Sequence, residues 1–451
     1  MNSEHPSHDL ISGKPAANPR VVLVALVAAC IGVLGSLIAN LLGKSIALVT
    51  NLAFYGRISS AWQSPADNRL GLWVILVPVA GALLIGVMAR YGSAAIRGHG
   101  IPEAMEQVLF NESRIPARIL LLKPLSAVIS IGTGGPFGAE GPIIATGSAL
   151  GSLVGQIWPT SADERKTLLA AGAAAGMAAT FGSPVSAVLL AMELLLFEYR
   201  VRSLVPVCLA SVSATLVRVA LVGTAPAFQV IASGEAPARA LIVYFALGAC
   251  LGLAAVAITK WVYALEDAFT RLPIHWMWWP AMGAVVVGVI GWIEPRSMGV
   301  GYDNIENIVS GRVVGGALLA LGAFKFGSWL IALSSGTSGG TLAPLFTIGS
   351  ALGGLLTSAI AQLAPGLGLD ARMGALVGMA ALFAGASRAI LASVVFAFET
   401  THATTAVLPL LTGCSAAYLV SCALMKHSIM TEKIARRAHA SQPRALSTWG
   451  Y

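Results

Sequence analysis

The sequence predicts an all-α polytopic membrane protein with two related halves of tilted and broken helices. Composition is the first reason, because 56% of the 451 residues are hydrophobic and only 11% are charged, whereas a typical soluble domain has about 25% charged residues. A block of sequence that recurs in both halves is the second reason. The third is a set of glycine-proline turns, each placed where an apolar helix could begin.

The recurring block reads PIIATGSALGSLV over Pro142–Val154 and PLFTIGSALGGLL over Pro344–Leu356, with seven of thirteen positions identical at an offset of 202 residues. At the same offset, GMAATF from Gly176 matches GMAALF from Gly378 at five of six positions. Two blocks in register indicate a duplication. Duplicated halves with broken helices at matching positions are typical of transporters whose site lies between the repeats.

Taken in order, the chain begins with polar residues 1–20, which we expect to form a flexible cytoplasmic N-terminus. The apolar run Val21–Leu42 is too long for a signal-peptide core and predicts a retained span. Many later segments are shorter than the roughly 20 residues of a full crossing, which predicts helices that meet inside the protein. These segments are about 72–89, 119–131, 142–157, 168–181, 184–197, 204–222, 240–262, 280–293, 313–334, 344–363, 373–384, 390–398 and 407–425.

We therefore predict a membrane domain over residues 21–437, with a first repeat at about 21–222 and a second at about 240–425. Two polar connectors, 57–69 and 294–312, predict a loop and a turn with a short amphipathic segment. Basic residues follow the last span, which places the tail in the cytoplasm by the positive-inside rule: Lys426, Lys433, Arg436, Arg437 and Arg444. Residues 438–451 are expected to be a short cytoplasmic tail without CBS domains.

The remaining bulk features exclude other classes of protein. The net charge of +8 does not indicate a nucleic-acid partner, because the basic residues lie in loops and in the tail. No cofactor or metal is expected. The cysteines lack metal-ligand spacing and are predicted to be buried free thiols: Cys30, Cys208, Cys250, Cys414 and Cys422.

Four segments could direct backbone N–H groups toward one anion. They are GHGIPE (98–103), GAEGP (138–142), GTLAP (340–344) and SIMT (428–431). Proline is favoured in the first turn of a helix, where its missing N–H leaves no bond unmade. A helix N-terminus carries free N–H groups and the positive end of the dipole, so it attracts anions. A plain membrane kink is the alternative for each turn.

Glu140 is the strongest functional candidate, because a carboxylate inside a membrane segment costs several kcal/mol and marks a functional site by default. At a helix N-terminus it could occupy an anion site and leave when displaced or protonated; the alternative is a structural acid. Lys123 could raise the local positive potential or act as a snorkelling end residue. Arg388 and Glu399 are expected to pair with other membrane charges.

These segments resemble the CLC family of chloride channels and chloride/proton exchangers. GHGIPE is similar to the family's GSGIPE, GAEGP to GKEGP and GTLAP to GxFxP, and the resemblance covers about Val21 to Arg437. It implies a CLC-type fold with two inverted-topology repeats, a homodimer with one pathway in each protomer, and a bacterial inner membrane with both termini cytoplasmic. It implies that Glu140 is the gating glutamate. The anion-binding residues that it implies are His99, Gly100, Ile101, Gly138, Ala139, Gly141, Thr341, Leu342 and Met430.

The sequence departs from the family pattern at four positions. His99 replaces the serine whose hydroxyl touches the central anion, and Ala139 replaces a basic residue. Met430 stands where the anion-coordinating tyrosine is expected. Leu194 stands where exchangers often carry the inner proton-transfer glutamate, which leaves the neighbouring Glu193 as a possible proton pathway and predicts weak proton coupling by that route.

The function predicted from the sequence is anion transport, with chloride as the default substrate and channel-like gating by Glu140. A chloride/proton or fluoride/proton antiporter is the alternative. The fluoride-selective branch shares the departures at the serine and tyrosine positions, but its second motif differs from GAEGP. An intramembrane enzyme is a remote alternative, since no HExxH motif or aspartate pair occurs. A receptor or scaffold would have no use for an isolated membrane carboxylate.

Overall fold

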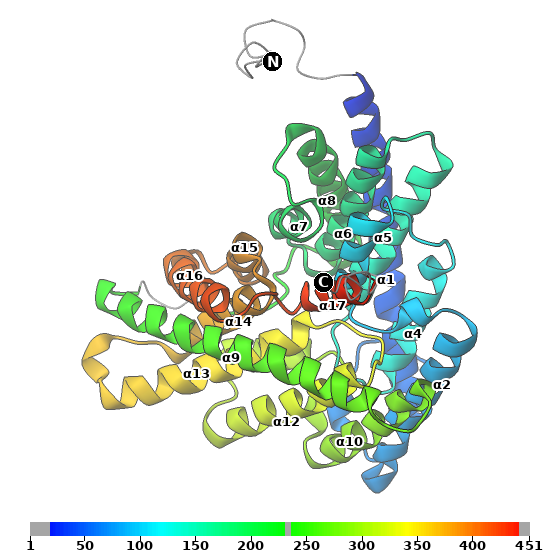
Figure 1. Ribbon diagram of the computed structural model, residues 1–451. Coiled ribbons are helices and arrows are strands. Elements are labelled where there is room, and N and C mark those ends of the chain that lie inside the picture. The colour runs from blue at the N-terminus through cyan, green and yellow to red at the C-terminus, as the bar shows by residue number, and fades with distance from the viewer. Residues whose placement is uncertain (1–18, 231–235, 442–451) are drawn as a thin grey trace, which may run out of the picture.

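The computed structural model describes residues 19–230 and 236–441. Within these ranges the chain forms seventeen α-helices and no strand (Figure 1). Eight of the described helices are long and apolar enough to cross a membrane. The prediction of an all-α polytopic membrane protein is confirmed.

The helices divide between the two halves of the chain. Those of the first half are α1 (Pro19–Tyr55), α2 (Leu76–Tyr91), α3 (Ile101–Phe110), α4 (Ile119–Gly132), α5 (Glu140–Ile157), α6 (Ala162–Phe181), α7 (Pro184–Ala191), which continues into a π-helical turn (Met192–Leu196), and α8 (Val201–Val222). Those of the second half are α9 (Ala238–Thr270), α10 (Trp279–Ile293), α11 (Tyr302–Val309), α12 (Gly315–Ser334), α13 (Leu342–Leu363), α14 (Ala371–Ser387), α15 (Ile390–Thr401), α16 (Val407–Leu424) and α17 (Glu432–Ser441).

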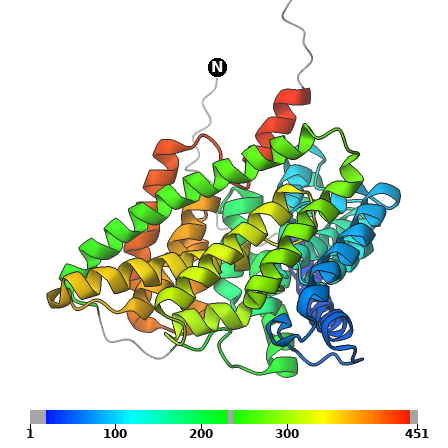
Figure 2. The same ribbon diagram turned by 90° about the horizontal axis from the view of Figure 1, so that it is seen from below.

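Both halves pack their helices in the same order. In the first, α5 lies against α6, α6 lies against α8, and α1 lies against both α6 and α8. In the second, α13 lies against α14, α14 lies against α16, and α9 lies against both α14 and α16. Figure 2 shows the long α9, in green, running across the second half. Because the same helix pairs recur in both halves, the chain consists of two structural repeats.

Glycines bring the paired helices into backbone contact. A Cβ atom added to Gly147 would lie 2.1 Å from the carbonyl oxygen of Gly172, so α5 and α6 can touch only because this position has no side chain. In the second half, a Cβ atom on Gly349 would lie 2.4 Å from the carbonyl oxygen of Gly378. Small residues allow this close approach, which membrane helices use because lipid gives them no hydrophobic reason to associate.

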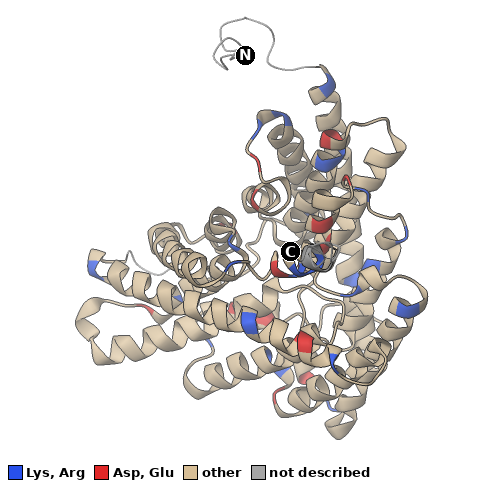
Figure 3. Cartoon of the chain, in the orientation of Figure 1, with Lys and Arg blue, Asp and Glu red and all other residues tan. Residues whose placement is uncertain are grey.

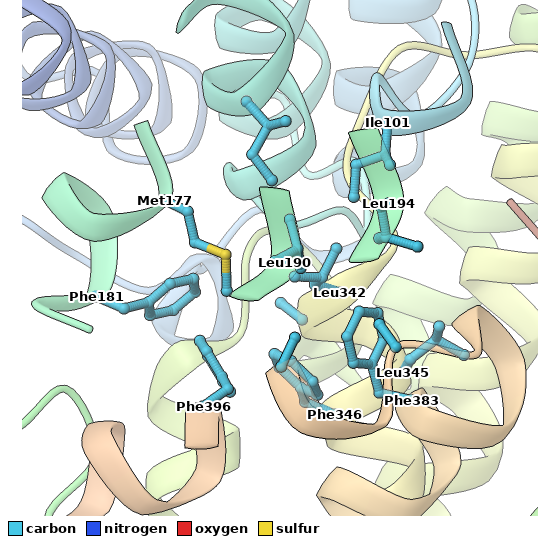
Figure 4. Packing of buried hydrophobic residues seen from close by; sticks show 14 of the residues in the cluster. Ile101, Met177, Phe181, Leu190, Leu194, Leu342, Leu345, Phe346, Phe383 and Phe396 are labelled. Atoms are coloured by element: carbon cyan, nitrogen blue, oxygen red, sulfur yellow. The ribbon is translucent and has the colours of Figure 1, made fainter. Parts of the chain in front are cut away.

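Aromatic side chains join the two halves in the core (Figure 4). The rings of Phe181 on α6 and Phe396 on α15 meet edge to face with their centroids 4.9 Å apart. Phe396 in turn stacks on Phe346 of α13, with a centroid separation of 4.7 Å. Aromatic pairs in these geometries contribute about 0.5–1.5 kcal/mol beyond the burial of their area. The core is therefore shared by both repeats.

Helix lengths differ from the sequence expectation at the start of the chain. The first helix is 37 residues long and extends from Pro19 to Tyr55, whereas Val21–Leu42 was expected. The helix continues because apolar residues resume after Lys44 and no proline or glycine-proline turn interrupts them. Pro19 and Arg20 thus belong to a helix, and the rest of the expected flexible N-terminus lies outside the described residues. So does the expected tail after Ser441.

Charges are sparse along the spanning helices (Figure 3), and apolar side chains face outward as well as inward. The prediction that all five cysteines are buried is wrong for this reason. Cys414 is buried and Cys208 is partly buried, but Cys30, Cys250 and Cys422 are exposed on the outer surface of the chain, all as free thiols. Because lipid tails are as apolar as a protein core, apolar surroundings in a membrane sequence do not distinguish the two locations.

Candidate anion pathway

Three of the four segments chosen from the sequence meet in space, each just before a helix. Gly138, which precedes α5, and Gly340, which precedes α13, exchange two backbone hydrogen bonds of 3.1 and 2.9 Å. The segment before α3 joins them, because Gly98 donates its N–H to the carbonyl of Thr337 at 3.2 Å. We call the meeting point of these segments the junction.

Close contact at the junction depends on glycine. A Cβ atom on Gly100 would lie 2.3 Å from the carbonyl oxygen of Gly141, and one on Gly141 would lie 2.1 Å from the carbonyl oxygen of His99 and 2.8 Å from the Cα atom of Gly340. Gly100 also has a φ of +95°, which residues with a side chain rarely adopt. The predicted positions Gly100, Gly141 and Gly340 are therefore in direct contact.

Two buried lysines hold the loops on either side of the junction. The Nζ atom of Lys123 donates hydrogen bonds of 2.8 Å to the carbonyls of Ile96 and Gly98. Lys325 does the same for two carbonyls of the 297–299 segment, at 3.1 and 2.8 Å. Lys123 is only 1% exposed, so it is not a snorkelling end residue. Both lysines satisfy the hydrogen-bonding capacity of carbonyl groups near the junction and hold them in place.

The segment that Lys325 holds is a site element that the sequence analysis treated as a connector. Gly299–Asn304 reads GVGYDN and corresponds to GHGIPE of Gly98–Glu103 at an offset of 201 residues. Both glycines of each copy have a positive φ, between +66° and +99°. The expected short amphipathic helix is present as α11, but it starts at a second copy of the first motif. The shared glycine spacing was the signal that could have revealed it.

Glu140 is the first residue of α5 and is completely buried. Its two carboxylate oxygens have no hydrogen-bond partner, although the Tyr302 hydroxyl and the Ala343 backbone N–H lie beside them. A Cβ atom on Gly138 would lie 1.7 Å from Oε2 of Glu140, and one on Gly340 would lie 3.1 Å from it. The carboxylate is therefore folded back over glycine at the N-termini of α5 and α13, where an anion is favoured.

Two cavities are bordered by residues near Glu140, and Glu140 itself lines neither of them. The first, here called the α11 cavity, has a volume of about 570 Å³ and is bordered by Ala139, Ile143 and Tyr302. Its charged lining residues are Lys44, Arg218, Asp303 and Glu306. The second, here called the α17 cavity, has a volume of about 250 Å³ and is bordered by Gly98 and His99.

Further polar atoms at the junction also lack partners. The Nδ1 atom of His99 and the hydroxyl of Thr341 are buried without a hydrogen bond, and so is the hydroxyl of Tyr302. An unsatisfied buried polar group costs about 1–3 kcal/mol. Such groups are rare in folded proteins and call for a ligand, an ion or an ordered water molecule. Their clustering around Glu140 fits a polar substrate.

The other predicted anion contacts offer no polar side chain. Ile101, Leu342 and Met430 are all 1% exposed or less. Met430 lies in a fixed loop, because the Tyr263 hydroxyl donates a 2.7 Å hydrogen bond to the carbonyl of Ile429. Any contact of these residues with an anion would come from backbone N–H groups or from the apolar surface of the side chains.

Glu193 and its repeat mate Glu399 serve as reciprocal helix caps. Glu193 accepts hydrogen bonds from the backbone N–H groups at the start of α15, at 3.1 and 3.0 Å. Glu399 on α15 accepts two bonds from the start of α7, at 3.0 and 2.8 Å. Leu194 is buried with Ile101 and Leu342 in the apolar cluster of Figure 4. The position at which exchangers often carry the inner proton-transfer glutamate is thus occupied by the packed, apolar side chain of Leu194.

The expectation that Glu399 and Arg388 pair with other membrane charges is wrong. Glu399 binds backbone N–H groups, as described above. Arg388 donates hydrogen bonds to backbone carbonyls at the end of α16, among them those of Ser421 at 3.2 Å and Met425 at 2.5 Å. Helix ends offer partial charges of both signs, so a partly buried ion can be satisfied without an opposite ion.

Replacing either cap should reduce stability and leave chloride transport intact. We expect Glu193→Gln and Glu399→Gln each to destabilise the protein by about 1–3 kcal/mol, because each loses two charge-assisted hydrogen bonds. Thermal melting in detergent and chloride flux in liposomes measure the two effects. The two variants control for each other. A loss of proton movement in Glu193→Gln alone would instead assign Glu193 to a proton pathway.

Comparison with known proteins places these features in a family. The profile of the family described as "Voltage gated chloride channel" matches residues 80–422. The H(+)/Cl(-) exchange transporter ClcA of Salmonella paratyphi B is 31% identical over 410 residues, which are 88% of this chain and 85% of that protein.

Solved structures share the fold. A slow cyanobacterial Cl⁻/H⁺ antiporter superposes with a TM-score of 0.83 at 23% identity, covering 95% of this chain and all of the antiporter chain. A CLC-type fluoride/proton antiporter gives a TM-score of 0.75 at 21% identity, covering 92% of this chain and 98% of that one. At these identities the matches establish the fold of the chain and leave its substrate to other arguments.

Proposed function

The chain belongs to the CLC family of voltage gated chloride channel proteins, and we propose that it moves chloride across the membrane in exchange for protons, with Glu140 as the gate. The observation that carries this proposal is the burial of Glu140, without a hydrogen-bond partner, next to residues that border two separate cavities. A carboxylate in this position can alternate between occupying the anion site and leaving it.

The carboxylate of Glu140 faces two helix N-termini, those of α5 and α13. Their free N–H groups and dipoles favour one negative charge. Glu140 supplies that charge when no other anion is present, and chloride can replace it when the side chain leaves. A carboxylate that leaves the site either remains charged or takes up a proton. In the second case each cycle carries a proton against chloride.

Exchange is favoured over channel-like conduction by two observations. The α11 and α17 cavities share no lining residue, and buried Glu140 is next to Ala139 of the first and close to His99 of the second, which fits an alternating pathway. The relative that is 31% identical is named an exchange transporter. Channel-like conduction is the alternative, in which Glu140 moves aside without carrying a proton. Fluoride/proton exchange is a second alternative, favoured by the departures at His99 and Met430.

We also propose that the protein is a homodimer in the bacterial inner membrane, with both termini cytoplasmic. The family resemblance supports the dimer. The basic residues that follow α16 support the orientation of the tail. Because Lys433 and Arg437 border the α17 cavity, they also support a cytoplasmic location for this cavity. No enzymatic activity is proposed, since the relative is a transporter.

A flux measurement in liposomes tests the proposed exchange. Purified protein is reconstituted into vesicles with more chloride inside than outside, and chloride release and external pH are followed together. We expect chloride efflux to drive proton uptake at a fixed ratio. Chloride release without proton uptake would identify a channel, and release of fluoride but not chloride would identify the fluoride alternative. Absence of any anion flux above that of protein-free vesicles would refute the proposal.

A further inference from the structure

We propose that His99 is the proton-binding group on the α17 side of the pathway, taking protons from the α17 cavity and passing them toward Glu140. This inference rests on the proposed exchange of chloride for protons. The imidazole of His99 would then transfer the proton that the side chain of Leu194 cannot bind.

His99 spans the boundary between the α17 cavity and the junction. The residue lines this cavity of about 250 Å³, yet it is only 6% exposed. The Nδ1 atom is buried and has no hydrogen-bond partner. The backbone carbonyl of His99 packs against Gly141, the residue that follows Glu140. The residue therefore borders a polar cavity on one side and packs against the start of α5, next to Glu140, on the other.

Glu103, the acidic residue close to His99, has both of its carboxylate oxygens bound to hydrogen-bond donors. Glu103 accepts the N–H of Gly100 on Oε2 at 2.7 Å and the ammonium of Lys433 on Oε1 at 2.8 Å. A carboxylate held by a backbone donor and a cation binds a proton poorly. Glu193, the residue before Leu194, uses both of its carboxylate oxygens to cap α15. Neither glutamate is suited to deliver protons to the junction.

The basic and phenolic neighbours are also engaged. Lys123 donates to two carbonyls, and the Tyr263 hydroxyl donates to the carbonyl of Ile429. Charged groups of both signs line the α17 cavity: Arg97, Glu103, Glu106, Glu266, Lys433 and Arg437. Glu103 pairs with Lys433 and Glu106 pairs with Arg437. The opposite charges of Glu103 and Lys433 therefore partly compensate each other near the imidazole of His99.

Imidazole has two ring nitrogens, so it can take a proton at one and release a proton from the other. A hydronium ion in the α17 cavity protonates one nitrogen of His99 and leaves water behind. The imidazolium then loses the proton on its other nitrogen toward the Glu140 carboxylate, and the ring returns to its starting tautomer by exchange with water. One proton crosses the ring, and nothing is oxidised or consumed. Chloride at the junction would stabilise the intermediate cation, which links the two ions.

Replacing His99 by glutamine tests the proposal, because glutamine keeps polar atoms of similar reach but does not titrate. We expect His99→Gln to reduce the number of protons moved per chloride by about tenfold or more. His402→Gln is the matched control, since His402 is exposed at the end of α15 and lines neither cavity. His99→Ser serves as a second variant if His99→Gln does not fold.

A carboxylate placed at the inner position provides a rescue. In the His99→Gln background, Leu194→Glu should restore part of the proton flux, because it returns a proton acceptor to the buried cluster near Leu342. An unchanged proton-to-chloride ratio in both His99 variants would overturn the assignment, as would an equal loss in His402→Gln. Wild-type protein that moves chloride without protons would instead refute the proposed exchange itself, and His99 would then have no proton to transfer.

Discussion

Glu140→Ala should transport chloride without moving protons, and its chloride flux should no longer depend on pH. The carboxylate of the wild-type residue occupies the site between the N-termini of α5 and α13. Alanine cannot reach that site or carry a proton, so chloride meets no competing charge there. We expect proton uptake to fall by about a hundredfold, the range over which a positioned proton carrier acts. Glu140→Gln should likewise lose proton transport, because its amide does not titrate.

The measurement is the paired chloride and pH recording in liposomes, repeated at several external pH values. Glu112→Gln is a suitable control, because Glu112 is an exposed carboxylate that pairs with Arg114 and Arg165 outside both cavities. If both Glu140 variants kept the pH dependence and proton ratio of the wild type, Glu140 would not be the gate. If Glu112→Gln lost pH dependence and proton transport as the Glu140 variants are expected to, these losses would reflect a general loss of negative charge.

The sequence was sufficient to identify the junction, because its parts follow local rules. Glycine next to a helix start and proline in the first turn are signals within a few residues, and they located Gly98, Gly138 and Gly340. A single carboxylate in an apolar segment identified Glu140 through the cost of burying charge. The repeat itself was visible as identical residues at one offset, which the packing of α5 on α6 and of α13 on α14 explains.

Other features could not be predicted because their partners lie about 200 residues away. Glu193 caps α15, and Glu399 caps α7. Nothing in either local sequence indicates that a helix N-terminus from the other half will supply the hydrogen bonds. Lys123 and Lys325 likewise bind carbonyls of loops that precede them by more than 20 residues. A buried charge predicts that a partner exists, but its identity is a property of the fold.

Gly138→Ala should open the gate without removing the carboxylate of Glu140. The new methyl group would lie 1.7 Å from Oε2 of Glu140, and the atoms nearest to it all belong to that carboxyl group. Gly138 is not among the glycines with a positive φ, so alanine fits its backbone. Because the end of a glutamate side chain is mobile, Glu140 should leave the site. We expect chloride transport with little proton coupling, as in Glu140→Ala.

A double-mutant cycle separates this effect from simple damage. In the Glu140→Ala background the methyl group has no carboxylate to displace, so Gly138→Ala should then change chloride flux by less than about twofold. Gly141→Ala is the contrasting variant, because its methyl group would meet the backbone of His99 at 2.1 Å and of Gly340 at 2.8 Å. Backbone cannot move aside as a side chain can, so we expect Gly141→Ala to fold poorly and transport nothing. Equal effects of Gly138→Ala with and without Glu140 would show that the methyl group acts on the loop and leaves the gate in place.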